Sequence, residues 1–352
     1  MGQVLRRVIT TILFLLVLNP VSVAADASGD NEEPVIDVMG KVVDHDYLEL
    51  VGGAKVYLPR IFMVDGDWYF FVNTQSAVDS GEFEMQESAL VRADGESISL
   101  DMSITSHLMY VWFGMLLTLF ITFWAASKYK KGVGAETEPK GISQNLFEVF
   151  FVFIRDDIAK EYIPGDKHKK FVNYLFSVFL AISFMNLFGL LPWGVATTAD
   201  LTVTATLAAI TFFITQWNGS KDHWQHVFMF PGVHPAMRII LTPVEILGLF
   251  TKPFALAIRL FANMLSGKIM IVCILGLIFI FTDIFGPAVG LSSSVFWVGL
   301  TALLYILKAF IALLQAYIFT LLSAVFIGMA VEEHHHEHES ESSVATATDV
   351  QV

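Results

Sequence analysis

The stretch that decides the fold is "MRIILTPVEILGLFTKPFALAIRLFANMLSGKIMIVCILGLIFIF", an almost unbroken apolar run at residues 237–281. A membrane-spanning α-helix needs about 20 such residues to cross about 30 Å of hydrocarbon. If wholly helical, this run would be about 70 Å long at 1.5 Å per residue, too long to stand upright in a bilayer. It must therefore tilt strongly, bend near Pro243 or Pro253, or fold into a hairpin.

The rest of the chain has the composition of a membrane protein. Of its 352 residues, 55% are hydrophobic, 31 are phenylalanine, and only 16% are charged. We predict an all-α polytopic membrane protein with about five membrane-crossing helices plus one interfacial helix, the last two crossing helices being long and strongly tilted. The predicted crossing helices lie at about 106–127, 171–192, 200–217, 237–281 and 295–331, and the interfacial helix at about 145–163.

The regions before and after the membrane domain are polar. Residues 1–25 have two arginines, a short apolar run and small residues near Ala25, which is typical of a cleavable signal peptide; an uncleaved anchor is the alternative. Residues 26–104 should form an extracytoplasmic region with a small β element, because two β-rich runs flank the hairpin signal Asp65-Gly66. The membrane domain then covers 105–331, and 332–352 form a polar tail.

The tail and the overall charge exclude several classes of function. "EEHHHEHE" at 332–339 could bind a metal, but we favour a solvated, disordered acidic tail because nothing fixes a coordination geometry. The net charge of −13 lies mostly in the acidic flanks, which argues against nucleic acid as a partner. The sequence shows no phosphate-binding glycine loop, catalytic triad or paired catalytic carboxylates. We therefore expect no catalytic residue, no cofactor and no metal, and membrane lipid as the surroundings.

The lysines and arginines predict the orientation, because short loops rich in them stay in the cytoplasm. Nine such residues lie between the first and second spans and two, Lys221 and Arg238, between the third and the start of the fourth, whereas 192–199 and 282–294 have none. This distribution agrees with an exported N-terminus and a cytoplasmic C-terminus. In a bacterium, the chain would be a multi-pass protein of the cell (inner) membrane.

Four basic residues remain inside the predicted spans, namely Lys252, Arg259, Lys268 and Lys308. Each costs about 2.5–3.5 kcal/mol at a helix centre on insertion scales, so such a charge usually faces protein or water and has a function. At 100° per residue, Glu245, Lys252 and Arg259 fall on one stripe, with Asn263 one turn further on. Lys268 points to the other side of the helix.

The last span has a stripe of its own, formed by Lys308, Gln315 and Ser323. If the two long helices pack together, the stripes could meet and form a hydrated half-pathway. The only acid within 250–330 is Asp283, near the outer end, so Arg259 lacks an obvious counter-ion in its own chain. Its carboxylate partner is then on another chain; the alternative is that Arg259 snorkels or pairs with Glu245.

Four motifs along the chain carry a resemblance to a known family. "RLFANMLSG" (259–267) and "LLQAYIFTLLSAVFIGMAVEEH" (313–334) resemble the arginine motif and the last helix of subunit a of the rotary F-type ATP synthase of bacteria. "FMNLFGLLPW" (184–193), with Asn186, and "TADLTVT" (198–204), with Asp200, resemble two further signatures. Together the motifs cover about residues 105–334, and the resemblance does not extend to 26–104.

The resemblance implies that the chain is the non-catalytic, proton-translocating stator subunit of the membrane sector. Its partners would be the ring of c subunits, subunit b of the peripheral stalk and the rest of the complex. The resemblance assigns Arg259 as the essential arginine, which attracts each c-ring carboxylate and prevents a proton from passing directly between two aqueous half-channels. It places Asn263, Gln315 and Glu245 on the proton pathway as well. Further pathway candidates are Lys252, Asn186, Asp200, Asp283 and Ser323.

This sequence departs from the family at two positions, because Lys268 and Lys308 stand where many members have a glutamate and a histidine. Two close ammonium groups repel, so we expect at least one of them to be neutral, to have a depressed pKa, or to be hydrogen-bonded to Asn263, Asp283 or Gln315. Cations in this place also favour H⁺ over Na⁺ as the transported ion. The alternative functions are a secondary transporter that binds an anion at Arg259, and a purely structural anchor.

Overall fold

The structure is a computed structural model that describes residues 46–49, 55–64, 66–86, 89–92, 98, 100–130, 141–191, 194–229 and 235–332. The predicted signal peptide and the histidine-rich tail beyond Glu332 lie outside these residues. The chain divides into two compact units. One contains the chain up to Phe113 together with 188–197 and 267–306, and the other contains 114–187, 198–266 and the chain from Leu307 onward.

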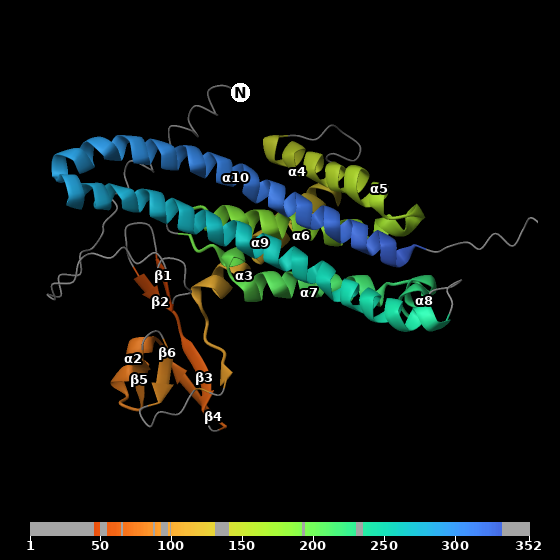
Figure 1. The fold of residues 1–352 in the computed structure, drawn as a ribbon, viewed down its shortest axis with the longest axis horizontal. Helices are drawn as coiled ribbons and strands as arrows, with labels where there is room; N and C mark the ends of the chain where they lie inside the picture. Colours follow the sequence, from red (N-terminus) through yellow and green to blue (C-terminus); the bar gives the residue numbers. More distant parts are fainter. Residues whose placement is uncertain are drawn as a thin grey trace, which may run out of the picture. The chain divides into compact units, whose positions relative to one another are not determined.

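Within its described residues, the N-terminal β element has seven short strands and one helix, and most of them are labelled in Figure 1. The elements are β1 (Tyr47–Glu49), β2 (Lys55–Tyr57), β3 (Arg60–Val64), β4 (Asp67–Phe71), α2 (Thr74–Asp79), β5 (Phe83–Gln86), β6 (Ala89–Arg92) and β7 (Leu100–Asp101). They form the pairs β1-β2 and β5-β6 and a three-stranded sheet of order β4-β3-β7. The hairpin predicted at Asp65-Gly66 is confirmed, since β3 pairs antiparallel with β4 around Gly66, whose φ of 96° suits glycine.

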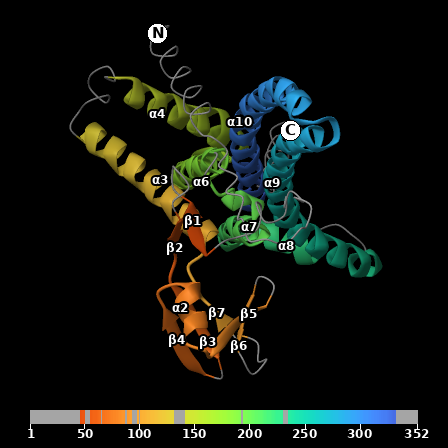
Figure 2. The same ribbon diagram turned by 90° about the vertical axis from the view of Figure 1, so that its left-hand side faces the viewer.

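One face of this sheet has a small aromatic core. Phe62 and Phe83 are fully buried and meet edge to face at 5.0 Å between ring centroids. Val64, Ala77 and Leu90 complete the cluster. Helix α2 lies beside β4 and β5 (Figure 2), and Asn73 caps it by accepting a hydrogen bond from the Ser76 amide at 2.7 Å.

The remaining described chain is helical, which confirms the predicted all-α membrane fold. Its elements are α3 (Ser106–Lys130), α4 (Ile142–Phe153), η1 (Ile154–Ala159), α5 (Lys160–Tyr162), η2 (Gly165–Lys167), α6 (His168–Gly189), η3 (Thr197–Ala199), α7 (Leu201–Trp217), α8 (Lys221–Met229), α9 (Pro235–Phe285) and α10 (Pro287–Val331). Four helical stretches are long and apolar enough to cross a membrane, in α3, α6, α9 and α10. The 17 residues of α7 reach the lower limit for a fifth crossing.

The bounds of the two long helices, α9 and α10, differ in part from the predicted spans. The run at 237–281 lies in one helix of 51 residues with Pro243 and Pro253 inside it, so the hairpin alternative is excluded. The last span begins at Pro287, not at 295, because Gly286 makes the turn with a φ of 86° and proline suits the first helical position. Residues 287–294 are helical, and their serine hydroxyls are satisfied within the helix by donating to carbonyls three residues back, as Ser292 does to Val289.

The predicted interfacial helix at 145–163 corresponds to the consecutive segments α4, η1 and α5, which run from Ile142 to Tyr162. The middle segment is a π-helix, a form that accommodates an extra residue per turn. Phe147 and Phe151 of α4 pack edge to face on Phe176 of α6, with ring centroids 5.0 and 5.2 Å away. These aromatic contacts hold α4 against α6.

Hydrogen bonds bring several helix ends to one end of the second unit. Lys170, at the start of α6, donates to the side chain of Asn218 at the end of α7 at 2.6 Å. Lys167 donates to the carbonyl of Val331, where α10 ends, at 2.9 Å. The beginning of α6 and the ends of α7 and α10 therefore lie on the same side, as an alternating series of membrane crossings requires.

Candidate functional site

Helices α9 and α10 meet at a buried polar cluster, as the two predicted stripes require. The side-chain amide of Asn263 on α9 donates to Oε1 of Gln315 on α10 at 3.5 Å. Lys308, one heptad before Gln315, donates from Nζ to the backbone carbonyl of Asn263 at 3.4 Å. The structure thus joins three of the predicted site residues in one cluster.

Burial makes this cluster costly unless its groups are hydrogen-bonded. Gln315 is 4% exposed and Lys308 is 9% exposed. An uncompensated polar group in an apolar interior costs about 1–3 kcal/mol, and an ammonium more. The partner observed for Lys308 is the carbonyl of Asn263, which is one of the alternatives expected for the two lysines. Gln315 Nε2 has no hydrogen-bond partner within the described chain.

Asn186 links a second pair of elements beside this cluster. It is fully buried on α6 and donates to the carbonyl of Ala312 on α10 at 3.1 Å. Its own carbonyl oxygen accepts from the hydroxyl of Thr198, in η3, at 2.7 Å. Both ends of the amide are therefore satisfied, so Asn186 fixes α6, η3 and α10 together one turn from Gln315.

Arg259 has very different surroundings. It lies on α9 one turn before Asn263, beside the buried face that Leu256 and Leu260 form, and its own side chain is exposed. Among the described residues, no ion pair or hydrogen bond involves its guanidinium. A fixed positive charge in a membrane-crossing helix is thus open to the exterior of the chain.

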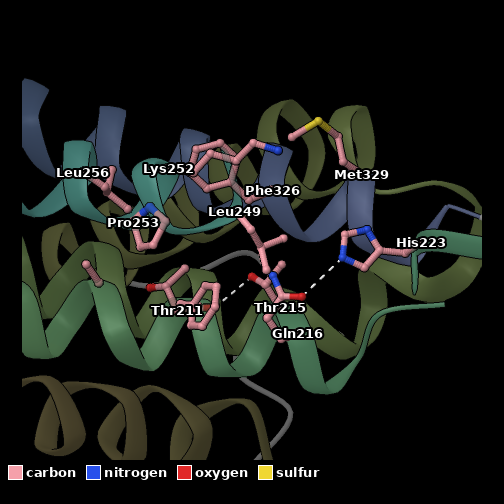
Figure 3. Close-up of a pocket in the computed structure, with 12 residues that line it drawn as sticks. Thr211, Thr215, Gln216, His223, Leu249, Lys252, Pro253, Leu256, Phe326 and Met329 are labelled. Atoms are coloured by element: carbon pink, nitrogen blue, oxygen red, sulfur yellow. Dashed lines mark hydrogen bonds between the residues drawn. The ribbon is translucent and has the colours of Figure 1, made fainter. Parts of the chain in front are cut away.

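A pocket of about 430 Å³, partly open to the outside, lies on the other side of Arg259 along α9 (Figure 3). Helices α7, α8, α9 and α10 surround it. Its lining residues are Ala208, Thr211, Phe212, Thr215, Gln216, His223, Leu249, Lys252, Pro253, Leu256, Phe326 and Met329. In Figure 3, His223 and Gln216 face each other, and their side chains are 3.3 Å apart. Lys252 Nζ lies 6.0 Å from the Phe326 ring centroid.

His223 is the group in this pocket that can change charge near neutral pH. It is half-buried, and this burial lowers the pKa of His223 below its usual value. The positive charge of Lys252 lowers the pKa further, the carboxylate of Glu245 raises it, and His226 lowers it slightly. Glu245 and Lys252, both predicted from the α9 stripe, therefore act electrostatically on one histidine of α8.

The other predicted site residues have more local surroundings. Asp200 caps α7 by accepting a hydrogen bond from the Thr202 amide at 2.7 Å, which is a structural function. Ser323 is buried and donates to the Phe319 carbonyl, one turn back on its own helix. Lys268 and Asp283 belong to the other compact unit, where Lys268 is half-buried and Asp283 exposed.

The sequence analysis did not identify the residues that α7 and α8 contribute to the pocket. The threonines of α7 at 204, 211 and 215 are buried and share one face, a spacing that could have revealed a polar side. Tyr174 of α6 contacts Thr211 with a hydroxyl–hydroxyl distance of 2.7 Å, so this polar face extends to α6. His223 lies between two of the predicted crossing helices, and only the folded structure brings it to the same pocket as Lys252.

These features define the class of the protein: a polytopic α-helical membrane protein in which Arg259 of α9, unpaired among the described residues, lies between a buried polar cluster and a polar pocket. Residues 108–328 match the family described as "ATP synthase A chain". An ATP synthase subunit a of Chloroherpeton thalassium is 41% identical over 263 residues, covering 73% of this chain and 76% of the relative. The subunit a of Pelodictyon phaeoclathratiforme is 36% identical over 313 residues, which cover 88% of this chain and 79% of the relative. The subunit a of Myxococcus xanthus is 41% identical over 244 residues, which cover 67% of this chain and 75% of the relative.

The chain therefore belongs to the ATP synthase A chain family.

Proposed function

We propose that Arg259 is the stator charge of a proton pathway through the membrane sector of an F-type ATP synthase, where this chain serves as subunit a. The observation that carries the proposal is the exposure of Arg259 without a counter-ion in the described chain. The family provides the context of a complex that couples proton flow to ATP synthesis. The anion-binding transporter, considered from sequence alone, lacks such support.

The missing counter-ion would be a carboxylate on a ring of c subunits. Inserting an arginine at a helix centre costs about 2.5–3.5 kcal/mol on insertion scales. A carboxylate 4 Å from the guanidinium returns about 4 kcal/mol at an effective dielectric constant of 20. The two values nearly balance, so the pair can form as each ring carboxylate arrives and can break again as the ring turns.

Arg259 would also separate two hydrated half-channels. Its guanidinium stays protonated at any physiological pH, so it cannot pass a proton along and repels one that approaches. Protons must then bind to the ring carboxylates on one side of Arg259 and leave on the other. In this scheme the chain carries no catalytic site for ATP, and its contribution to the complex is ion translocation.

The two polar regions on either side of Arg259 are the candidates for these half-channels. The pocket around Lys252 and His223 would open to the cytoplasm. The segment between α7 and α9 is one of the two that the lysines and arginines predict to be cytoplasmic. The cluster of Asn263, Gln315 and Lys308 would belong to the outer pathway. With this orientation, the N-terminus is outside the cytoplasm and the C-terminus inside, and subunit b would join from the cytoplasmic side.

The substitution Arg259→Ala in the assembled complex tests the proposal. ATP-driven proton pumping and ATP synthesis should be lost, while subunit a is still recovered with the c-ring. The matched control is Arg155→Ala, which removes an exposed arginine paired with Asp156 at 2.7 Å and should change coupling little. Normal coupling in an assembled Arg259→Ala complex would show that Arg259 has no function in transport.

A further inference from the structure

The sheet β4-β3-β7 has a second apolar face, opposite its aromatic core. Directly opposite residues in an antiparallel pair share a face of the sheet. Met63 of β3 lies opposite both Trp68 and Leu100, and Ile61 lies opposite Phe70. Met102 follows Leu100 by two residues, and its amide donates to the Ile61 carbonyl at 2.9 Å. We call this set the outer face: Ile61, Met63, Trp68, Phe70, Leu100 and Met102.

The outer face is exposed. Phe70 is 69% exposed, Met102 57%, Trp68 48% and Leu100 44%. An antiparallel sheet usually has one apolar face toward its core and one polar face toward water. Here the other face already holds the core around Phe62, so the outer face is not needed to fold the sheet. A cluster of large exposed apolar side chains of this kind marks an interaction surface.

Charged side chains are kept off this face. The register places Asp67 and Asp101 on the core side of the sheet, opposite Val64 and Phe62 respectively. Arg60 is also on that side, where it forms an ion pair with Asp101 at 3.6 Å. On the outer face the indole N–H of Trp68 is the single side-chain hydrogen-bonding group among the six residues.

The chain holds this face close to a membrane surface. β7 ends at Asp101 and the membrane-crossing helix α3 begins at Ser106. The five Cα–Cα steps from Asp101 to Ser106 span at most about 18 Å. The polar headgroup layer on each side of the hydrocarbon is about 5–8 Å thick. The last strand of the sheet therefore cannot move far from the lipid headgroups.

We propose that the outer face docks onto the lipid headgroup layer at the extracytoplasmic end of α3. Tryptophan and other aromatic residues favour this layer, where the ring contacts apolar chains and the indole N–H remains hydrated. The acidic residues of the sheet would then point away from the lipid. A protein partner fits less well, because protein interfaces have about one hydrogen bond per 100–200 Å² and the outer face offers one donor.

Photo-cross-linking in the intact complex, in its native membrane, tests this proposal. Phe70→p-benzoylphenylalanine places a photoreactive group on the outer face at an exposed position, and Met102→p-benzoylphenylalanine provides a second one. The matched control is Asp67→p-benzoylphenylalanine, exposed on the same strand as Phe70 but on the other side of the sheet. After irradiation, mass spectrometry should find several-fold more phospholipid adducts at positions 70 and 102 than at 67.

Three results would overturn the proposal. An adduct between position 70 or 102 and another subunit would identify a protein partner. An adduct with the helices of the same chain would show that the face packs internally. Equally low lipid adducts at all three positions in an assembled complex would show that the face stays in water.

Discussion

Arg259 and Lys308 are both basic residues on the two longest helices, yet their surroundings are opposite. Lys308 is almost completely buried and donates to the backbone carbonyl of Asn263. Arg259, one turn before Asn263 on α9, is exposed and has no partner within the described chain. One cation is thus held by its own chain, and the other is left open.

The difference distinguishes a charge that is open to a partner on another chain, Arg259, from one that is already bonded within its own chain, Lys308. A cation that must attract and release a passing carboxylate cannot be neutralised within its own chain, because a permanent partner would compete for it. A lysine bonded to a backbone carbonyl can instead position neighbouring polar groups such as Gln315. The two residues should therefore respond differently to substitution.

The largest effect is expected when Arg259, which is always protonated, is replaced by a residue that can lose its proton. In Arg259→Lys, an ammonium replaces the guanidinium and can release its proton when desolvated. Coupled ATP synthesis should fall by about 100-fold or more, since an interaction of about 4 kcal/mol is at stake. Inverted membrane vesicles should also leak protons passively. Wild-type synthesis without a leak would mean that any cation suffices at this position.

A smaller effect is expected from Lys308→Met, which removes the buried ammonium but keeps a flexible side chain of similar length. ATP-driven proton pumping should fall by about tenfold, equivalent to about 1.4 kcal/mol, because the polar cluster around Asn263 and Gln315 loses a member. Lys268→Met is the companion variant on the other side of α9. If both variants pumped protons at the wild-type rate, neither lysine would belong to the pathway.

The sequence predicted the long apolar helices and the isolated arginine, because both depend on local composition. The run at 237–281 is too apolar and too long for anything but a membrane-crossing helix. The lack of acidic residues around Arg259 can be read directly from the sequence. The start of α10 was misplaced because Gly286-Pro287 and three following serines resemble a loop. In the structure the serine hydroxyls bond to carbonyls of their own helix, so they do not interrupt it.

The pocket could not be predicted from the sequence, because it depends on tertiary contacts between helices. Thr211 and His223 lie on two helices with a turn between them, and Lys252 lies on a third. Each of these residues alone is compatible with a solvated surface. Only packing of α7 and α8 against α9 shows that they line one space.

A pH-dependent effect is expected from His223→Gln. Burial lowers the pKa of His223 below its usual value of about 6.5, and the positive charge of Lys252 adds to the shift. Acidification then adds a second cation beside Lys252 and should slow proton entry from the cytoplasmic side. Wild-type pumping by inverted vesicles should decline as the pH falls through the acidic range in which His223 binds its proton, and the variant should decline less.

The same shift makes a prediction for stability. The unfolded chain binds this proton more readily than the folded chain, so the stability associated with His223 is present above its usual pKa and is lost as the pH falls below it. His226→Gln is the matched control, since His226 is exposed on the same helix. Identical pH profiles for wild type and both variants would exclude His223 as the titrating group.

The smallest effect on transport is expected from Asn186→Leu, a substitution of similar volume at a fully buried position. It leaves the Ala312 carbonyl and the Thr198 hydroxyl without their bonds to Asn186, and should destabilise the helix packing by about 1–3 kcal/mol. Heating the solubilised complex should release subunit a earlier, while proton pumping per assembled complex stays near wild type. Thr198→Val removes one of the two bonds and should shift the release temperature less. Asn186 bonds to Ala312, which lies one turn before Gln315 on α10, so a fall in pumping as large as that of Lys308→Met would instead place Asn186 on the proton pathway.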